Sequence, residues 1–579
     1  MENIDRRSFL KGAAFLGGSA AVAGVGSFSS AVAAESSAHE TEQAEKVSGD
    51  DKSTNAEKKC SFELPPEPVL ESDIVETFEA EVVVVGAGLS GLVTAVSAME
   101  AGADVILFSA STKPTARGGS NNAIYSKAME RAGLPKVDPW YLQKEIYSNY
   151  AAVDQKKWSK YYQHSEEATN WLIDIMEAAG YYTVLEQPNF IAEGDLYSQA
   201  VCSHCWVADP LSDQVSLCQQ LVVDELAKRL TDNGVQVDFE MTGYQLIRED
   251  DNTGRVSAII AKRQSDDAYV KYVGTKAVVL ATGDFSTNKE LMEKYAPEFA
   301  GCVTEERYNE PVDYDIGLVT GGLYPGQGQV MGLQIGAAWQ KTLPNCPMFQ
   351  NRTVGAAQNR YQNFLGLLVD RNGERFMNEN ASRVLGPLVQ QMQAGGVSVA
   401  IWDTDWFNHF TWYNGAYSWE AREETVRSAG EMIATWDKNV EDGKAFKADT
   451  LEELIAAAGL PESTIDTINR YNEMCEKGED PEFCKDPKFL IPIKTPPFYA
   501  QRGETPKNEL STIFGGLRTN SNMQVCDEND NAIPGLYNVG TMIGDLWAGR
   551  YTFNIQGGSY GMGCLTLGYV TGKYIAENE

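Results

Sequence analysis

The chain is poor in basic side chains. Its 579 residues include 48 lysines and arginines against 81 aspartates and glutamates, which gives a formal net charge of −33. Nucleic acids and anionic membrane surfaces are bound through clustered Lys and Arg, so this balance argues against both as partners. A solvated acidic surface is the simplest interpretation of the charge. We therefore expect no nucleic-acid partner.

Cysteine is scattered through the chain and forms no cluster. The ten cysteines are too thinly spread for the disulfide framework of a small secreted domain. The one C-x-x-C pair, Cys202 and Cys205, has no second pair nearby to complete a zinc ribbon, and no His follows Cys205 as in a haem-attachment site. No run of cysteines has iron–sulfur spacing. The pattern predicts no metal site and leaves a disulfide or a structural pair of Cys202 and Cys205 open.

The chain lacks an apolar run that is long enough to stay in a membrane. The segment DRRSFLK (residues 5–11) precedes an Ala- and Gly-rich apolar run that ends in Ala31-Val32-Ala33. This arrangement is typical of a cleaved twin-arginine export signal, although Asp5 replaces the usual Ser or Thr. The run is too short and too rich in glycine to remain as an anchor. We predict a signal peptide over residues 1–34 and an extracytoplasmic location, in the periplasm or at the cell surface, without stable membrane insertion.

The remaining length is too great for one ordinary core. Residues 35–75 begin with a stretch rich in Ser, Glu, Lys and Ala that contains few large apolar side chains. Such a composition cannot bury enough apolar surface to offset the entropy of ordering. We predict a disordered linker over 35–75, followed by two domains.

A glycine-rich turn follows the first strongly apolar run of the mature chain. Residues 82–85 are long enough for a buried parallel strand, and G-x-G-x-x-G comes directly after them. The three glycines permit a tight turn, a close approach to a pyrophosphate and close packing of a helix on the strand. An Ala-rich helix (92–101) and a second strand (104–108) complete the βαβ context that this motif requires. The expected phosphate-binding residues at this helix N-terminus are Gly86, Gly88, Leu89, Ser90 and Gly91.

The residue after the second strand is unusual for a dinucleotide fold. An acidic side chain normally holds the ribose hydroxyls at this position. This chain has Ser109, followed by Ala110 and Ser111. A serine hydroxyl can bond a ribose hydroxyl, but without the strength that a charge adds. We therefore expect Ser109 to make the ribose contact more weakly.

Further glycine-rich segments favour FAD over NAD. Residues 117–123 (RGGSNNA) can run beside a flavin ring, and the apolar strand over 277–280 leads into Ala-Thr-Gly. Residues 533–540 read as a turn and a short strand, and 557–577 as a glycine-rich start to an apolar helix. The N-terminal dipole of that helix would stabilise an anionic reduced flavin. The additional residues expected at the cofactor are Gly118, Gly119, Ser120, Ala281, Thr282, Gly283, Gly540, Gly557 and Gly558.

In this order the segments resemble the flavoprotein family of soluble fumarate reductases, urocanate reductases, L-aspartate oxidases and 3-ketosteroid dehydrogenases. The resemblance runs from about residue 79 to residue 577 and includes G-x-R-F-x-N-E-x-x-x-R at 373–383. It implies an α/β fold, with a Rossmann-like FAD-binding domain formed by 76–344 and 499–579. An α+β capping domain would be inserted at 345–498, where Thr450 precedes a helical pattern that it should cap. The resemblance implies FAD as cofactor and a substrate site between the domains.

The last arginine of the 373–383 segment carries the strongest catalytic hypothesis. Arg383 matches the residue that in the fumarate reductases delivers a proton to the substrate carbon opposite the hydride. Because the pKa of arginine is very high, this role needs a relay and a transfer concerted with hydride arrival. The relay residues of the family fall near 359–362, where Arg360 is the candidate substitute. The alternative role for Arg383 is an ion pair, and Arg375 and Glu379 are expected to stabilise the segment itself.

The chain departs from the dicarboxylate-binding members of the family at two histidine positions. Those members have a His-Pro-Thr segment and a histidine before Gly-Gly, whereas this chain has NCPM at 345–348 and STIFGG at 511–516. The second substrate arginine of the family falls on Arg550 or on Tyr551. Arg550 would hold a carboxylate through a bidentate pair, whereas Tyr551 would polarise a carbonyl, as in the ketosteroid enzymes. The aromatic residues of 401–420 are expected mainly in the core of the cap.

The resemblance implies a reductase in which FAD N5 passes a hydride to an activated alkene and Arg383 protonates the neighbouring carbon. The missing histidines favour an α,β-unsaturated acid with an aryl group, such as a hydroxycinnamate or a urocanate-like acid, over fumarate. The alternatives are a ketosteroid-type dehydrogenase or enone reductase, and an electron-carrying flavoprotein without a substrate. Because the chain has no haem or iron–sulfur motif, we expect an external electron donor, a membrane-linked cytochrome or flavoprotein of anaerobic respiration.

Overall fold

The computed structural model describes residues 59–186, 200–209, 218–316, 321–349, 366–379, 386–409, 429–504, 510–549, 551 and 557–579. The predicted export signal therefore lies outside the described residues. Lys59–Glu579 forms one compact unit. Among the described helices, none combines the length and the apolar character that crossing a membrane requires.

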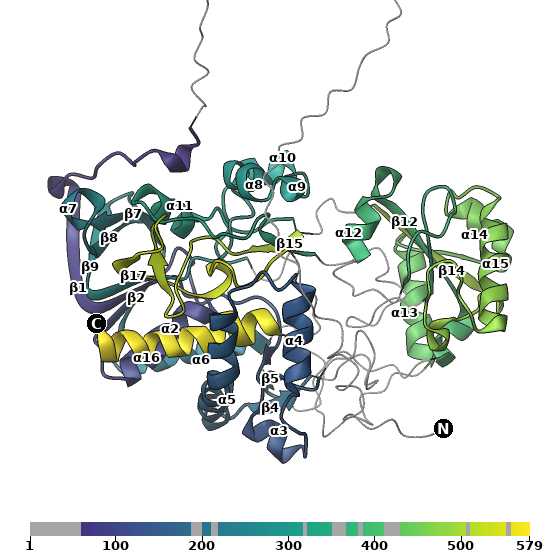
Figure 1. Ribbon diagram of the computed structural model, residues 1–579, viewed down its shortest axis with the longest axis horizontal. Helices are drawn as coiled ribbons and strands as arrows, with labels where there is room; N and C mark the ends of the chain where they lie inside the picture. Colours follow the sequence, from purple (N-terminus) through teal and green to yellow (C-terminus); the bar gives the residue numbers. More distant parts are fainter. Residues whose placement is uncertain are drawn as a thin grey trace, which may run out of the picture. The chain divides into compact units, whose positions relative to one another are not determined.

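A mixed eight-stranded sheet forms the centre of the nucleotide-binding part (Figure 1). Its strand order is β16-β17-β9-β1-β2-β6, and β8 joins β7 to β9 by antiparallel pairing. Strands β17, β9, β1, β2 and β6 run parallel to one another, so their carboxyl ends share one edge. The bounds are β1 (Ile74–Val85), β2 (Val105–Phe108), β6 (Gln236–Asp238), β7 (Met241–Arg248), β8 (Val256–Arg263), β9 (Tyr269–Leu280), β16 (Gln524–Cys526) and β17 (Ala532–Asn538).

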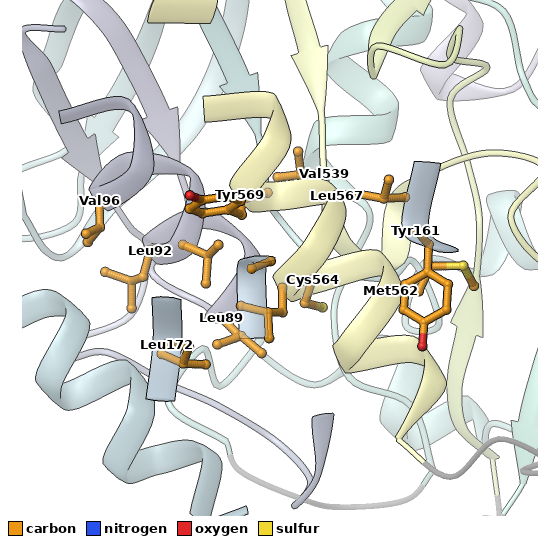
Figure 2. Packing of buried hydrophobic residues seen from close by; sticks show 14 of the residues in the cluster. Leu89, Leu92, Val96, Tyr161, Leu172, Val539, Met562, Cys564, Leu567 and Tyr569 are labelled. Atoms are coloured by element: carbon orange, nitrogen blue, oxygen red, sulfur yellow. The ribbon is translucent and has the colours of Figure 1, made fainter. Parts of the chain in front are cut away.

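The main core packs helices against this sheet. Figure 2 shows Leu89, Leu92 and Val96 of one helix in a cluster with Leu172, Cys564 and Tyr569, and Tyr161 of the same cluster beside Met562. The contact is close because small residues lie at the crossing: a Cβ on Gly572 would lie 2.0 Å from the Ser97 hydroxyl oxygen. The helices of this layer are α2 (Leu89–Glu100), α5 (Gln155–Ala178), α6 (Cys218–Asp232) and α16 (Leu567–Asn578). The parallel sheet and its crossover helix confirm the predicted α/β class.

Two smaller sheets border the carboxyl edge. Strands β3 (Asn121–Asn122), β5 (Ser203–Val207) and β4 (Tyr182–Leu185) form an antiparallel sheet, and β10 (Cys346–Phe349) pairs antiparallel with β15 (Leu510–Phe514). The remaining helices outside the predicted cap are α3 (Lys127–Arg131), α4 (Pro139–Ser148), α7 (Glu249–Asn252), α8 (Lys289–Tyr295), α9 (Pro297–Ala300), α10 (Glu305–Asn309) and α11 (Gln327–Gln334).

A separate four-stranded sheet occupies the predicted capping region. Its order is β11-β12-β14-β13, with β11 (Leu367–Val369), β12 (Val397–Asp403), β13 (Phe446–Ala448) and β14 (Phe498–Glu504). The helices here are α12 (Gly386–Gln391), α13 (Ala429–Glu441), α14 (Leu451–Ala457) and α15 (Thr464–Lys477). Thr450 caps α14 as predicted, by accepting a hydrogen bond from the Glu453 N–H. Trp402 and Trp406 are buried in the core of this region, also as expected.

The strand pairing differs from the predicted boundaries of 345 and 498. Strand β14 belongs to the sheet of the capping region through Glu504, because it pairs with β12 along its whole length. Strand β10 pairs instead with β15, which lies in the C-terminal part of the chain. The division into two domains stays a prediction. The sheet pairing places residues 346–349 with the nucleotide-binding part and residues 498–504 with the capping region.

The predicted disordered linker ends earlier than residue 75. A 3-10 turn, η1 (Ser61–Glu63), precedes β1, which begins at Ile74. Phe62 is 1% exposed and packs in a cluster with Trp339 and Met292. The composition of 35–75 concealed this anchor, because a single large apolar side chain hardly changes the average over forty residues.

Candidate flavin site

Four of the segments predicted to bind the cofactor converge on the carboxyl edge of the parallel sheet. Gly86 follows β1, Ser109 follows β2 and Ala281 follows β9, while Gly540 comes two residues after β17. In open α/β sheets, ligands bind in the crevice outside this edge. The structure thus brings together residues that are up to 454 positions apart in the chain.

The geometry of the glycine turn fits a pyrophosphate. Gly86 has φ +116°, and a Cβ there would lie 2.5 Å from the Ala281 carbonyl oxygen. A Cβ on Gly91 would lie 2.0 Å from the Gly86 carbonyl oxygen, so the backbone itself fills both positions. Over Gly88 the nearest atom is 3.8 Å away, which leaves space for a ligand. Helix α2 begins at Leu89 without a side-chain cap, so the N–H groups of its first turn suit an anion.

The loop over 118–120 lies against the segment that starts at Gly557. The N–H of Asn122 donates to the Gly557 carbonyl at 3.3 Å. A Cβ on Gly561 would lie 2.1 Å from the Asn122 carbonyl oxygen, and one on Gly118 would lie 2.6 Å from the ring of Tyr560. This close crossing leaves no room for side chains between the two segments. The sequence predicted Gly118 and Gly557 at the cofactor, but not that their lack of a side chain allows the two segments to pack together.

The C-terminal helix begins as a π-helix directly after Gly558. This segment, η9 (Ser559–Thr566), continues without a break into α16. Its first turn lies at the loop over 118–120, because Gly557 and Gly561 contact Ser120 and Asn122. The placement agrees with the expected role of a helix N-terminus near a flavin, and that role stays a prediction.

Ser109 is less available to a ribose than expected. Its side chain lies 2.8 Å from the Ser111 hydroxyl and the residue is 7% exposed. Its backbone N–H donates to the Asp238 carbonyl, and its carbonyl accepts from the Met241 N–H. The two serines thus form a neutral hydroxyl pair where related folds carry an acid. The contact of Ser109 with a ribose stays a prediction.

Several buried polar atoms around the loop over 117–121 have no partner among the described residues. They are Arg117 Nε, both amide atoms of Asn121, and Ser511 Oγ. An unsatisfied buried polar group costs about 1–3 kcal/mol, so native proteins rarely keep one without a ligand or water. This donor and acceptor set fits a bound polar molecule at the loop. Sequence reasoning missed Asn121 and Ser511, and it named Arg117 only as the first letter of a motif.

A buried carboxylate, Asp284, connects the end of β9 to β15. It is 1% exposed and accepts the Thr512 hydroxyl at 2.7 Å. It also accepts the backbone N–H groups of Ile513 and Tyr324, at 3.3 and 3.2 Å, and the Ser286 hydroxyl at 3.0 Å. The sequence signal for this residue was its place directly after Ala-Thr-Gly. These donors satisfy the carboxylate, and the bonds from Thr512 and Ile513 attach β15 to the loop that follows β9.

The two segments in which the chain departs from the dicarboxylate-binding relatives are hydrogen-bonded strands. In the β10–β15 register, Cys346 lies opposite Phe514 and Met348 opposite Thr512. Phe514 is 2% exposed, with its ring 5.0 Å from that of Tyr551 and 6.0 Å from that of Trp547. Burial raises the pKa of the Cys346 thiol well above its usual value, so it is neutral. Cys346 and Phe514 therefore make this part of the ladder apolar, whereas the two histidines of the dicarboxylate-binding relatives would make it basic.

Tyr551 is the one predicted catalytic residue that the structure describes. It is 3% exposed, and its hydroxyl oxygen accepts the Ser559 N–H at 3.1 Å. Its ring packs edge-on against Trp547 at 4.8 Å. The other predictions, Arg360, Arg383 and Arg550, lie outside the described residues.

Arg375 and Glu379 stabilise their own segment, as predicted. The guanidinium makes two 2.9 Å bonds to Glu379 and one of 2.8 Å to Asp480. Lys485 completes the buried network at 3.2 Å from Glu379 and donates to the Gly366 carbonyl at 3.1 Å. Burial lowers the pKa of Arg375, but the two carboxylates outweigh it and raise the pKa overall. The network fixes the chain four residues before Arg383 and at Gly366, six residues after Arg360.

The C-x-x-C motif is not a cysteine pair. Cys202 packs in the main core, and burial raises the pKa of its thiol to about 12. Cys205 lies in β5 and packs in a different cluster, with Cys218 and Val184. Side chains three positions apart in a strand point to opposite faces, which explains the separation. Within the described ranges, no group of three His, Cys, Asp or Glu side chains is placed to hold a metal ion.

His204, between these cysteines, anchors the strand that carries Asn121. Its Nε2 lies 2.6 Å from the Ser126 hydroxyl and its Nδ1 lies 3.1 Å from the Asn121 carbonyl oxygen. Burial lowers the pKa of His204 to about 4, so the imidazole is neutral at neutral pH. We assign it a structural role beneath the loop.

Known proteins resemble the chain along most of its length. A protein of Vibrio harveyi named NADH:acrylate oxidoreductase is 26% identical over 368 residues, which cover 61% of this chain and 32% of that protein. The vinyl phenol reductase of Lactiplantibacillus plantarum is 25% identical over 525 residues, or 86% of this chain and 96% of that protein. The solved structure of a flavocytochrome c3 fumarate reductase in its open conformation is 19% identical, with a TM-score of 0.59, and covers 90% of this chain and 82% of that one.

The likeness to the solved structure shows the fold, and the family follows from a further comparison. The FAD binding domain family matches residues 81–559, which include the glycine turn, the loop over 117–121 and the Gly557–Gly558 pair. The chain therefore belongs to this family, with FAD as its cofactor, and is an FAD-dependent oxidoreductase of the fumarate reductase type.

Proposed function

We propose that the protein reduces an activated carbon–carbon double bond and that its substrate is an α,β-unsaturated acid with an aromatic ring. A hydroxycinnamate or a urocanate-like acid has this chemistry. Similarity to an acrylate oxidoreductase and to a vinyl phenol reductase supports the reaction. The observation that carries the choice of substrate is the Phe514–Trp547–Tyr551 cluster at the β10–β15 ladder. Rings at this place favour a flat aromatic substrate over a second carboxylate.

Two arginines carry the proposed protonation step. When bound, FAD supplies the hydride that one alkene carbon accepts. Arg383 gives a proton to the adjacent carbon, and Arg360 then reprotonates Arg383. Concerted transfer is essential, because free arginine is a very weak acid. The buried Arg375–Glu379–Lys485 network supports this assignment, since it fixes the chain on the approach to both arginines.

Of the two candidates, Arg550 is better suited than Tyr551 to stabilise the charge that develops on the activating group. Tyr551 already uses its hydroxyl oxygen for the Ser559 N–H, and its ring is buried. The tyrosine keeps its O–H as a donor, but its burial leaves that group little access to a substrate carbonyl. Its packing weighs against the ketosteroid-type alternative, which relies on tyrosine hydroxyls. A guanidinium at Arg550 would stabilise the charge that develops on the activating group.

The direct test is anaerobic reoxidation of reduced viologen by the purified holoprotein. Hydroxycinnamates, urocanate, fumarate and an enone steroid are offered in turn, with Arg383→Ala beside Arg371→Ala. Arg371 is exposed and serves as the matched control. We expect the aryl acids to oxidise the dye, Arg383→Ala to lose on the order of 10²–10⁴ in rate, and Arg371→Ala to match the parent. An Arg383→Ala variant that keeps the parental rate would contradict the mechanism, and oxidation by the enone steroid alone would replace the substrate class.

We further propose that the protein works outside the cytoplasm and is reduced by a membrane-linked cytochrome or flavoprotein. The DRRSFLK segment supports export, and the missing haem and iron–sulfur motifs support an external donor. Changing Arg6 and Arg7 together to Lys should hold the unprocessed protein in the cytoplasmic fraction. Rapid turnover of the purified protein with NADH alone would refute the proposed donor.

A further inference from the structure

Arg117 is a partly buried cation for which the described residues supply no carboxylate. Its Nη2 donates to the Ser511 carbonyl at 2.8 Å, and its guanidinium lies 5.9 Å from the centre of the Tyr324 ring. Its Nε is buried without a partner, and no acidic side chain lies within ion-pair distance among the described residues. Removing a cation from water without a counter-charge is costly. An arginine in this state is suited to bind an anionic ligand.

The groups that face Arg117 do not neutralise it. Burial raises the pKa of Tyr560 and of Tyr324, and it raises that of the Cys564 thiol to about 12, so all three are uncharged at neutral pH. Asp284, the buried carboxylate that follows β9 and accepts from Thr512 of β15, is also held by the Ser286 hydroxyl and backbone N–H groups. The positive charge of Arg117 therefore stays available.

A second unsatisfied group lies beside it. The Ser511 hydroxyl is buried and has no partner within the described part of the chain, although its carbonyl binds Arg117. The Nε–H and the second Nη2–H of Arg117 form the fork that binds a carboxylate through two parallel bonds. The Ser511 hydroxyl adds a third donor. Together they offer the donor set of a carboxylate site.

Its place in the fold assigns this site to the substrate. Arg117 directly precedes Gly118 and Gly119, and Ser511 lies on β15 next to Thr512 and Phe514. This is the strand on which the dicarboxylate-binding members of the resembled family carry a histidine. We propose that Arg117 and Ser511 bind the carboxylate of the substrate and make the enzyme select acids over neutral alkenes. The proposal rests on the proposed function, since it names the group that the same site recognises.

The first test compares an acid with its own ester. The holoenzyme and its Arg117→Gln variant are assayed by viologen oxidation with 4-hydroxycinnamate and with methyl 4-hydroxycinnamate, which differ only in the charge. Loss of a charge-assisted pair should raise KM for the acid on the order of 10- to 100-fold and leave that for the ester unchanged. Arg117→Lys should recover part of the loss, and Arg371→Gln, the exposed control, should keep the parental KM for both compounds. An equal effect on acid and ester would overturn the proposal.

The second test does not depend on turnover. Binding of 3-(4-hydroxyphenyl)propionate, the saturated acid, is followed by the absorbance change of the oxidised flavin, and bound FAD is measured in each variant. We expect a weaker Kd by the same factor with full FAD content. FAD loss on substitution would mean that Arg117 serves an anionic group of the cofactor, and an unchanged Kd would mean that it serves neither; both overturn the proposal. If no alkene oxidises the dye but the propionate Kd still depends on Arg117, the proposed reaction fails and the acid site stands.

Ser511→Ala provides a check if Arg117→Gln does not fold. It removes one hydroxyl from a strand and leaves the charge in place. A selective weakening of propionate binding, about 3- to 10-fold, supports the site. An unchanged Kd contradicts the participation of Ser511 in it.

Discussion

At the scale of single residues, the buried charges of the 366–379 segment decide how firmly the proposed proton donor is held. Glu379 faces Arg375 and Lys485, and all three side chains are at most 1% exposed. Replacing Glu379 by Gln leaves two buried cations with one carboxylate, Asp480, in full contact. We expect a loss of about 3–5 kcal/mol in the free energy of unfolding, measured with urea. Glu374→Gln, at an exposed position in the same turn, should match the parent.

His204 predicts a specific acid sensitivity. Burial lowers its pKa to about 4, against about 6.5 in the unfolded chain. Between these values the unfolded chain binds the extra proton, so the native state loses stability as pH falls through this window. Urea unfolding of His204→Gln and the parent at pH 7 and 4.5 should show a smaller acid loss in the variant, by roughly 2–3 kcal/mol. His164→Gln, on the exposed side of α5, should keep the parental loss; an identical loss in His204→Gln would contradict the assignment.

Single residues also show what a sequence can and cannot predict. The pairing of Arg375 with Glu379 was predictable, because both belong to one motif. The importance of Arg117 was not, since it depends on the absence of a carboxylate from segments far away in the chain. The spacing of Cys202 and Cys205 left a pair open, and only the structure shows that they pack in different clusters.

At the scale of elements, the contact between β3 and η9 is the tightest part of the flavin site. Gly561→Ala would place a Cβ 2.1 Å from the Asn122 carbonyl oxygen, and backbone on both sides cannot yield. We expect a loss of roughly 1–3 kcal/mol in stability and a lower FAD content, measured by thermal unfolding and by the flavin absorbance per chain. Gly430→Ala in α13 meets nothing within 4 Å and should be neutral or gain up to about 1 kcal/mol. Full FAD retention in Gly561→Ala would show that this contact does not shape the site.

Element boundaries were predicted well where the pattern was periodic or apolar. The end of β1 and the cap of α14 followed from Val82–Val85 and Thr450. The outer half of β1 was missed, because its residues 74–81 are largely exposed and carry no apolar run. The predicted boundary at 498 falls at the start of β14, and the pairing of this strand with β12 involves residues about a hundred positions earlier, which a local pattern does not reveal.

At the scale of the whole molecule, the compact unit begins at Lys59. A chain that starts there should bind FAD and unfold at the same temperature as the mature protein. A chain that starts at Ile74 loses Phe62, which packs in a cluster with Trp339 and Met292. Removing this anchor should cost about 3–5 kcal/mol, seen as a lower urea midpoint. Equal midpoints for the two truncations would show that the turn at Ser61–Glu63 adds nothing to the fold.

The crossing of the loop at Gly118–Ser120 with Gly557–Gly561 also has a consequence in time. One wall of the cofactor cradle comes from the first part of the nucleotide-binding region, and the other comes from a segment about 440 residues later in the chain. The cradle is therefore incomplete until Gly557–Gly561 has been synthesised, and FAD capture must come after that point. A chain that stops before Gly557 would lack this wall of the cradle and remain colourless. We propose that the protein crosses the membrane already folded. Bound flavin would then show that both segments of this crossing are in place before export.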